Sequence, residues 1–280
     1  MASNHSLDQN LTPEMRKNLF GNAYLNMLWH CPSDPRFPYW VHLPDEYYEE
    51  EHPQYELMVI VHGTGCAVET YIKEGKELAD RHHLAILAPL FPGGLLERDD
   101  FNSYKMLSCD GVRYDQILLS MIGDMEKRYP GVRTDKFYMF GHSGGGQFAN
   151  RFLFVHPERL KAVSIGAPGR PTFLNPQEDY FWGVRDFKNY FDKDMDLEMI
   201  RRVPVQITVG EFDTKYIGDS PYGDNRVARM RSLKKNLEEA GLRVSLEILP
   251  GLAHEDGERE RVQTAERFFI KTAGECIDKD

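Results

Sequence analysis

A serine within a glycine-rich segment is the residue of this sequence best placed for chemistry. The segment GHSGG at 141–145 sets Ser143 in a G-x-S-x-G pattern, after an aromatic-rich run at 136–140 and before a helix-like run at 144–156. A serine in a sharp turn from strand to helix has its hydroxyl exposed at the helix N-terminus, where a nucleophile belongs. A G-x-S-x-G pattern alone is weak evidence, and a glycine-rich surface turn is the competing interpretation. The strand and helix on its two sides favour the nucleophile.

A nucleophilic serine needs two partners, which can be sought in a fixed order along the chain. A histidine must accept the hydroxyl proton, and a carboxylate must hold that imidazole in the correct tautomer. Hydrolases with this turn place the acid after the serine and the histidine last. Asp213 follows a strand-like run 70 residues after Ser143, and His254 follows the next such run 41 residues further on. We predict a catalytic triad of Ser143, Asp213 and His254, with Glu211 as the alternative acid.

A second glycine-containing turn is expected to complete an oxyanion hole. The apolar run 57–61 ends in HGTG at 62–65, at the position where hydrolases of this type supply a backbone N–H to the substrate carbonyl. We expect the N–H groups of Thr64 and Gly144 to be the two donors, with Gly65 as the second choice in the first loop. A simple glycine turn between strand and helix is the competing interpretation.

Strand-like and helix-like runs alternate along the chain, which predicts a parallel sheet in a single α/β domain. The expected strands are 38–43, 57–61, 84–89, 136–140, 161–166, 204–209 and 244–249, and the expected helices are 68–82, 113–128, 144–156, 225–240 and 258–273. We expect residues 1–37 to form an N-terminal arm and residues 38–280 to form the domain. No internal repeat or low-complexity tract is present.

Two irregular segments are expected to lie over the predicted site. Residues 167–203 interrupt the strand and helix pattern as a short lid insertion rich in aromatic residues, and residues 91–112 form a second long loop. Phe181, Trp182 and Tyr104 are the candidate substrate-binding residues, because aromatic side chains could build an apolar acyl or aryl pocket. The alternative, given equal weight, is that these rings only cover the sheet.

The composition limits which binding partners and which cellular compartment we expect for this protein. The chain has 280 residues, 41% apolar residues and a formal net charge of −10. Because no basic stripe is evident, we expect neither nucleic acid nor membrane as a partner, and a small-molecule substrate instead. No apolar run is long enough to span a bilayer and no signal-like segment is evident, which predicts a soluble, cytoplasmic protein. The oligomeric state is left open, with a homodimer as one option.

Metal, cofactor and disulfide chemistry find little support. The four cysteines are widely spaced without a C-x-x-C pair and are expected to be reduced thiols. His82 and His83 are adjacent on a helix-like run and cannot both face one ion, so no metal site is assigned.

Together, HGTG at 62–65, GHSGG at 141–145, EFD at 211–213 and PGLAH at 250–254 resemble the motifs of α/β-hydrolase-fold serine hydrolases. The resemblance covers roughly residues 38–275 and is strongest to the polyhydroxybutyrate depolymerase-like, feruloyl esterase-like and dienelactone hydrolase-like group. It implies a mostly parallel, twisted eight-stranded sheet with helices on both faces, a Ser-His-Asp triad and no cofactor. Polymer-degrading members are typically exported, whereas no signal-like segment is evident in this sequence, and this departure from the family argues against a polymer substrate.

The expected activity is hydrolysis of an ester or thioester of a small neutral, aromatic or apolar compound through an acyl-enzyme. A hydrolase of carbon–carbon bonds in β-dicarbonyl compounds would use the same triad. A peptidase is disfavoured because no gating domain is present, and a non-catalytic ligand receptor on the same fold is disfavoured by the complete triad.

Overall fold

The structure is a computed structural model that describes residues 27–48 and 53–277. Most of the expected N-terminal arm lies outside the described residues. The cysteines Cys31, Cys66 and Cys109 are free thiols, whereas the side chain of Cys276 is outside the described part.

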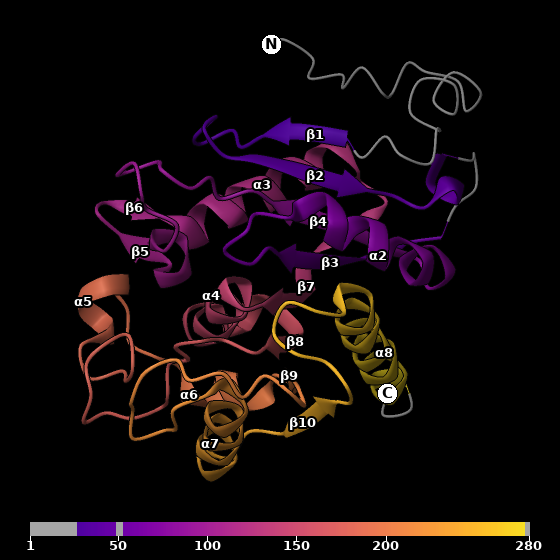
Figure 1. The fold of residues 1–280 in the computed structure, drawn as a ribbon. Coiled ribbons are helices and arrows are strands. Elements are labelled where there is room, and N and C mark those ends of the chain that lie inside the picture. The colour runs from indigo at the N-terminus through magenta and orange to yellow at the C-terminus, as the bar shows by residue number, and fades with distance from the viewer. Residues whose placement is uncertain (1–26, 49–52, 278–280) are drawn as a thin grey trace.

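The described chain is built on an eight-stranded sheet in the order β1-β2-β4-β3-β7-β8-β9-β10 (Figure 1). The strands are β1 (Met27–His30), β2 (Pro38–His42), β3 (Tyr55–Val61), β4 (Leu84–Pro89), β7 (Val132–His142), β8 (Leu160–Gly166), β9 (Val205–Gly210) and β10 (Val244–Leu249). β2 is antiparallel to both β1 and β4, and the strands from β4 to β10 are parallel to their neighbours. The expected mostly parallel sheet is confirmed.

Helices cover both faces of the sheet. They are α2 (Val68–Arg81), α3 (Tyr114–Arg128), α4 (Gly144–Val155), α5 (Phe187–Phe191), α6 (Leu197–Arg202), α7 (Arg226–Glu239) and α8 (Glu258–Ile277). Short 3-10 helices lie at Asp45–Tyr48, Ser103–Met106 and Pro157–Arg159, and β5 (Ser108–Cys109) pairs with β6 (Val112–Arg113) in a separate hairpin. The expected helices and the seven expected strands all appear, with ends shifted by a few residues.

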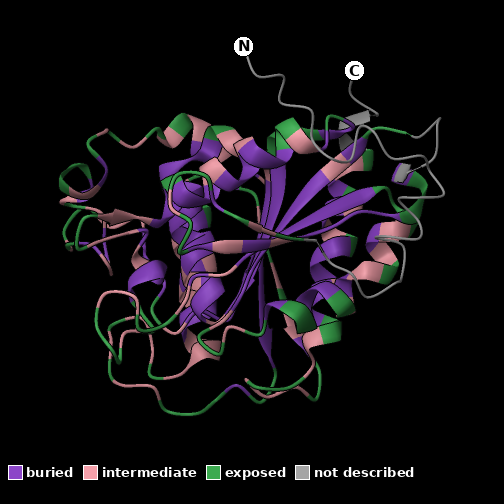
Figure 2. Ribbon diagram, turned by 90° about the horizontal axis from the view of Figure 1, so that it is seen from above, coloured by how far each residue is buried: buried purple, intermediate pink, exposed green. Residues whose placement is uncertain are grey.

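Two hydrophobic cores lie on opposite sides of the central strands. Along β3, Leu57, Val59 and Val61 enter the core beneath α3, α4 and α7, whereas Met58 and Ile60 enter the core beneath α2 and α8. Successive side chains of a strand point to opposite faces, so a strand buried on both sides is an unbroken apolar run. Figure 2 shows these buried strands between helices whose outer surfaces are exposed. The sheet therefore supplies a rigid base for residues at its strand ends.

Strand β1 lies inside the region expected to be an arm. Leu28, Trp29 and His30 pair with Trp40, Tyr39 and Pro38 of β2. The Trp29 indole donates a hydrogen bond to the Tyr129 hydroxyl at 2.9 Å. The sheet thus begins before residue 38, and the part of the expected arm from Met27 onward is an edge strand. A run of only four residues at the edge of a sheet gives too short a pattern to be recognised in the sequence.

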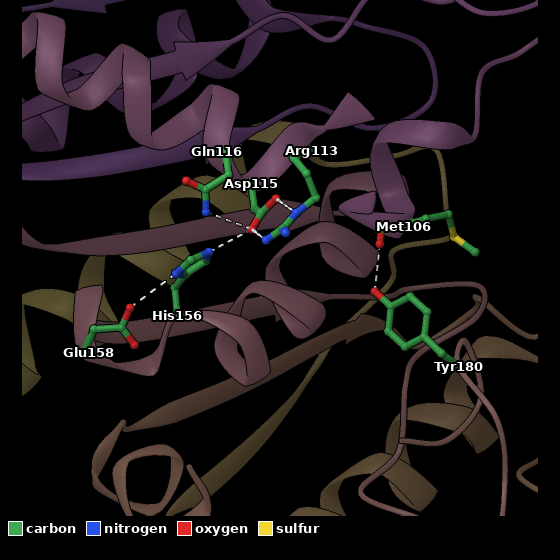
Figure 3. Close-up of polar contacts among 7 residues, drawn as sticks. All are labelled: Met106, Arg113, Asp115, Gln116, His156, Glu158 and Tyr180. Carbon is green, nitrogen blue, oxygen red and sulfur yellow. Dashed lines mark hydrogen bonds and ion pairs between the residues drawn. The ribbon is translucent and has the colours of Figure 1, made fainter. Parts of the chain in front are cut away.

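The two irregular segments are tied to each other and to the sheet. The Tyr180 hydroxyl of the 167–203 insertion donates to the Met106 carbonyl oxygen of the 91–112 loop at 2.7 Å (Figure 3). Within the insertion, Phe173, Phe187 and Phe191 are at most 4% exposed. Most rings of the insertion therefore serve as core, in line with the alternative that they cover the sheet.

A buried ionic network joins the start of α3 to the end of α4 (Figure 3). The Arg113 guanidinium donates to both carboxylate oxygens of Asp115, at 2.9 and 2.6 Å. The His156 ring contacts Asp115 through Nε2 at 2.8 Å and Glu158 through Nδ1 at 3.2 Å. Burial works against ionisation of Asp115, but its hydrogen bonds with His156 and Arg113 outweigh this and lower its pKa to about 2. The network fixes α4, the helix that carries the candidate nucleophile.

Candidate active site

Ser143 lies in a strained turn between β7 and α4. It is the N-cap of α4 and has φ 56° and ψ −111°, a backbone conformation that residues other than glycine rarely adopt. The turn requires glycine on both sides, because a Cβ on Gly141 would lie 2.2 Å from the Gly145 carbonyl oxygen. A Cβ on Gly145 would lie 2.1 Å from the Val61 carbonyl oxygen. The sequence therefore places a serine hydroxyl beyond the end of β7, at the positive end of the α4 dipole.

The structure brings the three predicted triad side chains together. His254 Nε2 lies 2.9 Å from Ser143 Oγ, and His254 Nδ1 lies 2.6 Å from Asp213 Oδ2. Asp213 follows β9 and His254 follows β10, and parallel neighbours bring these strand ends to the same edge as Ser143. An imidazole that donates from Nδ1 to a carboxylate is left with Nε2 as a base toward the hydroxyl. The arrangement can therefore deprotonate Ser143.

Asp213, and not Glu211, is the carboxylate in contact with the histidine. Asp213 is 1% exposed, and its second oxygen accepts a hydrogen bond from Arg226 Nη1 at 3.3 Å. Glu211 is exposed and accepts instead from the Gly251 backbone N–H at 2.9 Å. The Arg226 guanidinium offsets part of the cost of burying the Asp213 charge.

A second histidine supports the loop that carries His254. His142 Nε2 is 3.1 Å from the His254 carbonyl oxygen, so this nitrogen carries the proton and donates. The two rings lie 4.8 Å apart between centroids. Burial, with the nearby Arg261 charge, lowers the pKa of His142 well below its usual value, which keeps the ring neutral. Arg261 donates to the Ala253 carbonyl oxygen, so two buried side chains hold consecutive carbonyl groups of this loop.

The HGTG loop is held against the turn at Ser143 by a buried neutral histidine. His62 Nδ1 donates to the Gly63 carbonyl oxygen at 2.6 Å, and His62 Nε2 accepts from the Phe91 backbone N–H at 2.9 Å. Burial lowers the pKa of His62 to about 4, so this tautomer persists at neutral pH. The Tyr104 hydroxyl donates to the His62 carbonyl oxygen at 3.1 Å. These contacts fix the backbone that leads to Thr64.

Thr64 and Gly144 are neighbours, as an oxyanion hole requires. A Cβ on Gly144 would lie 3.2 Å from the Thr64 backbone nitrogen. Neither backbone N–H donates to any acceptor among the described residues. Two unused N–H groups side by side, at the start of a helix, can stabilise negative charge on a substrate oxygen.

Comparisons with known proteins place this architecture. No protein-family model matches the sequence, and no curated protein sequence matches it. The poly(3-hydroxybutyrate) depolymerase LpqC from Bordetella parapertussis has a TM-score of 0.71 at 21% identity, over 94% of this chain and 96% of that one. Poly(aspartic acid) hydrolase-1 from Sphingomonas sp. KT-1 has a TM-score of 0.69 at 18% identity, over 87% of this chain and 97% of its own. A ferulic acid esterase has a TM-score of 0.64 at 17% identity, over 88% and 96% of the two chains.

The chain has the α/β-hydrolase fold. In this fold a nucleophile is exposed at the turn after a central strand, with the acid and the histidine on later strand ends. Ser143, Asp213 and His254 occupy these positions in the present α/β-hydrolase chain.

The three expected substrate-binding residues have different surroundings in the α/β-hydrolase structure. Phe181 lines a cavity of about 500 Å³ beside α4. Trp182 does not line it and packs against Tyr222, with ring centroids 5.9 Å apart. Tyr104 is 4% exposed and stacks on Phe91, so it supports the HGTG loop and does not line the cavity either. A buried phenol needs an acceptor for its hydroxyl, and Tyr104 finds one beneath the site.

Several residues around the site gave no recognisable signal in the sequence. Lys105 donates to Thr64 Oγ1 at 2.8 Å across 41 positions of the chain, and Arg226 reaches Asp213 from the next helix. Such contacts depend on the packing of loops, so no motif or spacing points to them. Within the described residues no group of three or more His, Cys, Asp or Glu side chains is arranged to hold a metal ion. Over the same part of the chain, no helix is both long and apolar enough to cross a bilayer.

Proposed function

We propose that this protein is a serine hydrolase that cleaves an ester or thioester through an acyl-enzyme. The observation that carries the proposal is the chain of contacts from Asp213 through His254 to Ser143, at 2.6 and 2.9 Å. The esterase and depolymerase among the similar structures favour an ester bond as the target.

In the proposed reaction, His254 Nε2 accepts the Ser143 proton as Oγ attacks the substrate carbonyl carbon. The N–H groups of Thr64 and Gly144 hold the resulting oxyanion. The intermediate collapses by expelling an alcohol or thiol, which takes the proton from His254 and leaves an acyl group on Ser143. A water molecule then gives its proton to His254 and attacks the acyl carbon. The acid product leaves and Ser143 regains its proton.

A fluorophosphonate probe tests this proposal directly, because it reacts with activated serine nucleophiles. We expect stoichiometric labelling of the purified protein at Ser143, located by peptide mass spectrometry, and no labelling of Ser143→Ala. Hydrolysis of p-nitrophenyl acetate should fall by roughly three orders of magnitude in both Ser143→Ala and His254→Ala. The exposed Ser245 on β10 gives a matched control, since Ser245→Ala should label and hydrolyse as the unmodified protein does. Full hydrolytic activity in Ser143→Ala, or labelling elsewhere, would refute the proposal.

A further inference from the structure

The cavity beside the candidate nucleophile is lined by positive charge. Lys105, Arg170 and Arg229 are among its lining residues, together with Gln147 and Phe181, and no described lining residue carries a carboxylate. The whole chain has a formal net charge of −10. A concave site with three cations and no acid therefore stands out against the composition of the protein, and it concentrates positive potential where a ligand would enter.

The cavity lies next to the proposed oxyanion hole. Lys105 Nζ donates to Thr64 Oγ1 at 2.8 Å, and a Cβ on Gly144 would lie 2.7 Å from Lys105 Cε. Gln147 is one helical turn beyond Ser143, and its backbone N–H donates to the Ser143 carbonyl oxygen at 3.1 Å. The cavity is therefore close enough for a substrate whose carbonyl meets Ser143 to extend a second group into it.

The Lys105 ammonium is buried without an ion-pair partner. Lys105 is 5% exposed, and Nζ donates to Thr64 Oγ1 and to Asn102 Oδ1, both neutral acceptors. No carboxylate of the described residues lies within ion-pair distance of it. Burial, and after it the Arg151 charge, lowers the pKa of Lys105 to about 8. Asp100 and Cys66 act in the opposite direction, and Arg170 acts in the same direction as Arg151.

The two arginines differ in how many donors they can offer. Arg229 is 2% exposed and is held by the carbonyl oxygens of Gly169, Gly218 and Gly223, so its charge is fixed in place. Arg170 is exposed, and its side chain contacts no acceptor within residues 27–48 and 53–277. Its guanidinium fork and the third N–H of Lys105 are therefore free. One bidentate fork and one ammonium match the two oxygens of a carboxylate.

We propose that this cavity binds a carboxylate of the substrate, so that the enzyme acts on esters or thioesters that carry a free carboxylate beside the scissile bond. This inference rests on the proposed hydrolase function and replaces the neutral substrate expected from the sequence. Phe181, which lines the same cavity, supplies apolar contact for the chain between the two groups. Arg170 is the residue assigned to recognition of the charge, with Lys105 as the second donor.

Matched ester pairs test the proposal on both sides of the scissile bond. The acyl-side pair is mono-p-nitrophenyl adipate and the p-nitrophenyl ester in which an isopropyl group replaces the carboxylate. The alcohol-side pair is p-acetoxybenzoate and p-isopropylphenyl acetate, and hydrolysis of both is measured as the release of acetate. We expect the charged member of at least one pair to have the higher kcat/KM, by about tenfold or more, since hydrogen bonds between charged groups are worth at least this much. Arg170→Gln should reduce that ratio severalfold, because Lys105 remains as the second donor.

A charge-matched control distinguishes recognition of the carboxylate by Arg170 from the effect of the protein's overall charge. Lys127 is exposed in the last turn of α3, and Lys127→Gln removes one positive charge outside the cavity. It should keep the unmodified preference for the charged ester. Equal or better hydrolysis of the neutral member in both pairs would overturn the proposal. An undiminished preference in Arg170→Gln would also overturn it.

Binding without turnover distinguishes failure of this inference from failure of the proposed function. In the Ser143→Ala protein, adipate should raise the melting temperature increasingly as its concentration rises, whereas Arg170→Gln in the same background should weaken the effect. If no ester is cleaved and no serine is labelled, the hydrolase function is refuted and the adipate measurement still decides on the anion site. Stabilisation by inorganic phosphate that exceeds that by adipate would overturn the assignment to a carboxylate.

Discussion

At the scale of single residues, the geometry around Ser143 depends on groups that do not themselves touch a substrate. His62 binds the backbone of the HGTG loop. His142 lies within hydrogen-bond distance of the His254 carbonyl oxygen, and Arg261 donates to the carbonyl oxygen of the preceding residue, Ala253. All three are buried, and burial lowers the pKa of both histidines. A positioning group that stays neutral keeps the same hydrogen bonds across the neutral pH range.

His142 provides a test of this positioning role. His142→Ala removes the donor to the His254 carbonyl oxygen, and one neutral hydrogen bond is worth about 1 kcal/mol. We expect kcat for p-nitrophenyl acetate to fall by about fivefold to tenfold with little change in KM, because the base is displaced and the binding cavity is not. His142→Gln, whose amide can donate from a similar position, should recover most of kcat. A loss confined to KM, or no rescue by glutamine, would contradict the role.

The meeting of the three candidate triad side chains could be predicted from the sequence because the expected chemistry fixes residue types and their order. Ser143, Asp213 and His254 each follow a strand-like run, so parallel strands are enough to gather them. The surrounding shell could not be predicted in this way. Lys105 and Arg226 are ordinary charged residues in the sequence, and only the folded loops bring them to Thr64 and Asp213.

At the scale of elements, the start of α3 and the end of α4 are linked through His156. Burial disfavours the charged ring, but hydrogen bonds to Asp115 and Glu158 outweigh burial and raise the pKa of His156. A raised pKa in the folded state stabilises the protein at pH values below the unfolded pKa, and the contribution is lost as pH rises through the folded value. The helix that positions Ser143 is therefore held more firmly in mild acid.

Replacing His156 should change stability in a pH-dependent way. His156→Gln is expected to lower the free energy of unfolding by more at pH 5.5 than at pH 8.5. At the lower pH the substitution removes a charged imidazole that binds Asp115 and Glu158, whereas at the higher pH it removes a neutral one. Denaturant titrations at the two pH values measure this difference. His82 is exposed at the end of α2, and His82→Gln serves as the control. A cost for His156→Gln that grows with pH would contradict the assignment.

Element boundaries followed from sequence wherever an apolar run was long. β3, β4, β8 and β9 lie within a few residues of their expected positions because central parallel strands are buried, mostly apolar runs between turn residues. The edge strand β10 also lies at its expected position, although its residues alternate between half-buried and exposed. β7 extends to Val132, four residues before its expected start. Exposed polar residues interrupt the buried ones along its first half, so this part of the strand does not form an apolar run. The insertion at 167–203 gave an aromatic composition but no periodicity, so its folded path could not be predicted.

At the scale of the whole molecule, one buried carboxyl sets a pH dependence of stability. Glu266 on α8 is 0% exposed, and neither side-chain oxygen has a hydrogen-bond partner among the described residues. It lies against α2, where a Cβ on Gly75 would be 3.1 Å from its Oε1. Burial raises the pKa of Glu266 to about 9. The folded protein therefore keeps this group protonated at a pH where the unfolded chain ionises it.

Glu266→Gln should flatten the stability profile. Because the unfolded chain releases this proton first, the free energy of unfolding should fall as pH rises from about 4.5 toward 9, by up to about 1.4 kcal/mol per pH unit. The neutral amide lacks this linkage, so the variant is expected to lose less stability than the unmodified protein between about pH 4.5 and pH 8. Glu260 is exposed on the same helix, and Glu260→Gln serves as the control. Identical profiles for unmodified protein and Glu266→Gln would disprove the linkage.

The placement of β10 next to β9 also governs when the reactive centre comes into being. Ser143 and His254 are separated by 111 residues, and the intervening chain supplies three further strands of the sheet, β8, β9 and β10. Long-range pairing of this kind is reached late, after local helices and the first strand pairs have formed. A polypeptide still emerging from the ribosome therefore carries an inert hydroxyl until its C-terminal quarter docks. In refolding experiments, recovery of turnover reports completion of the sheet and not its nucleation.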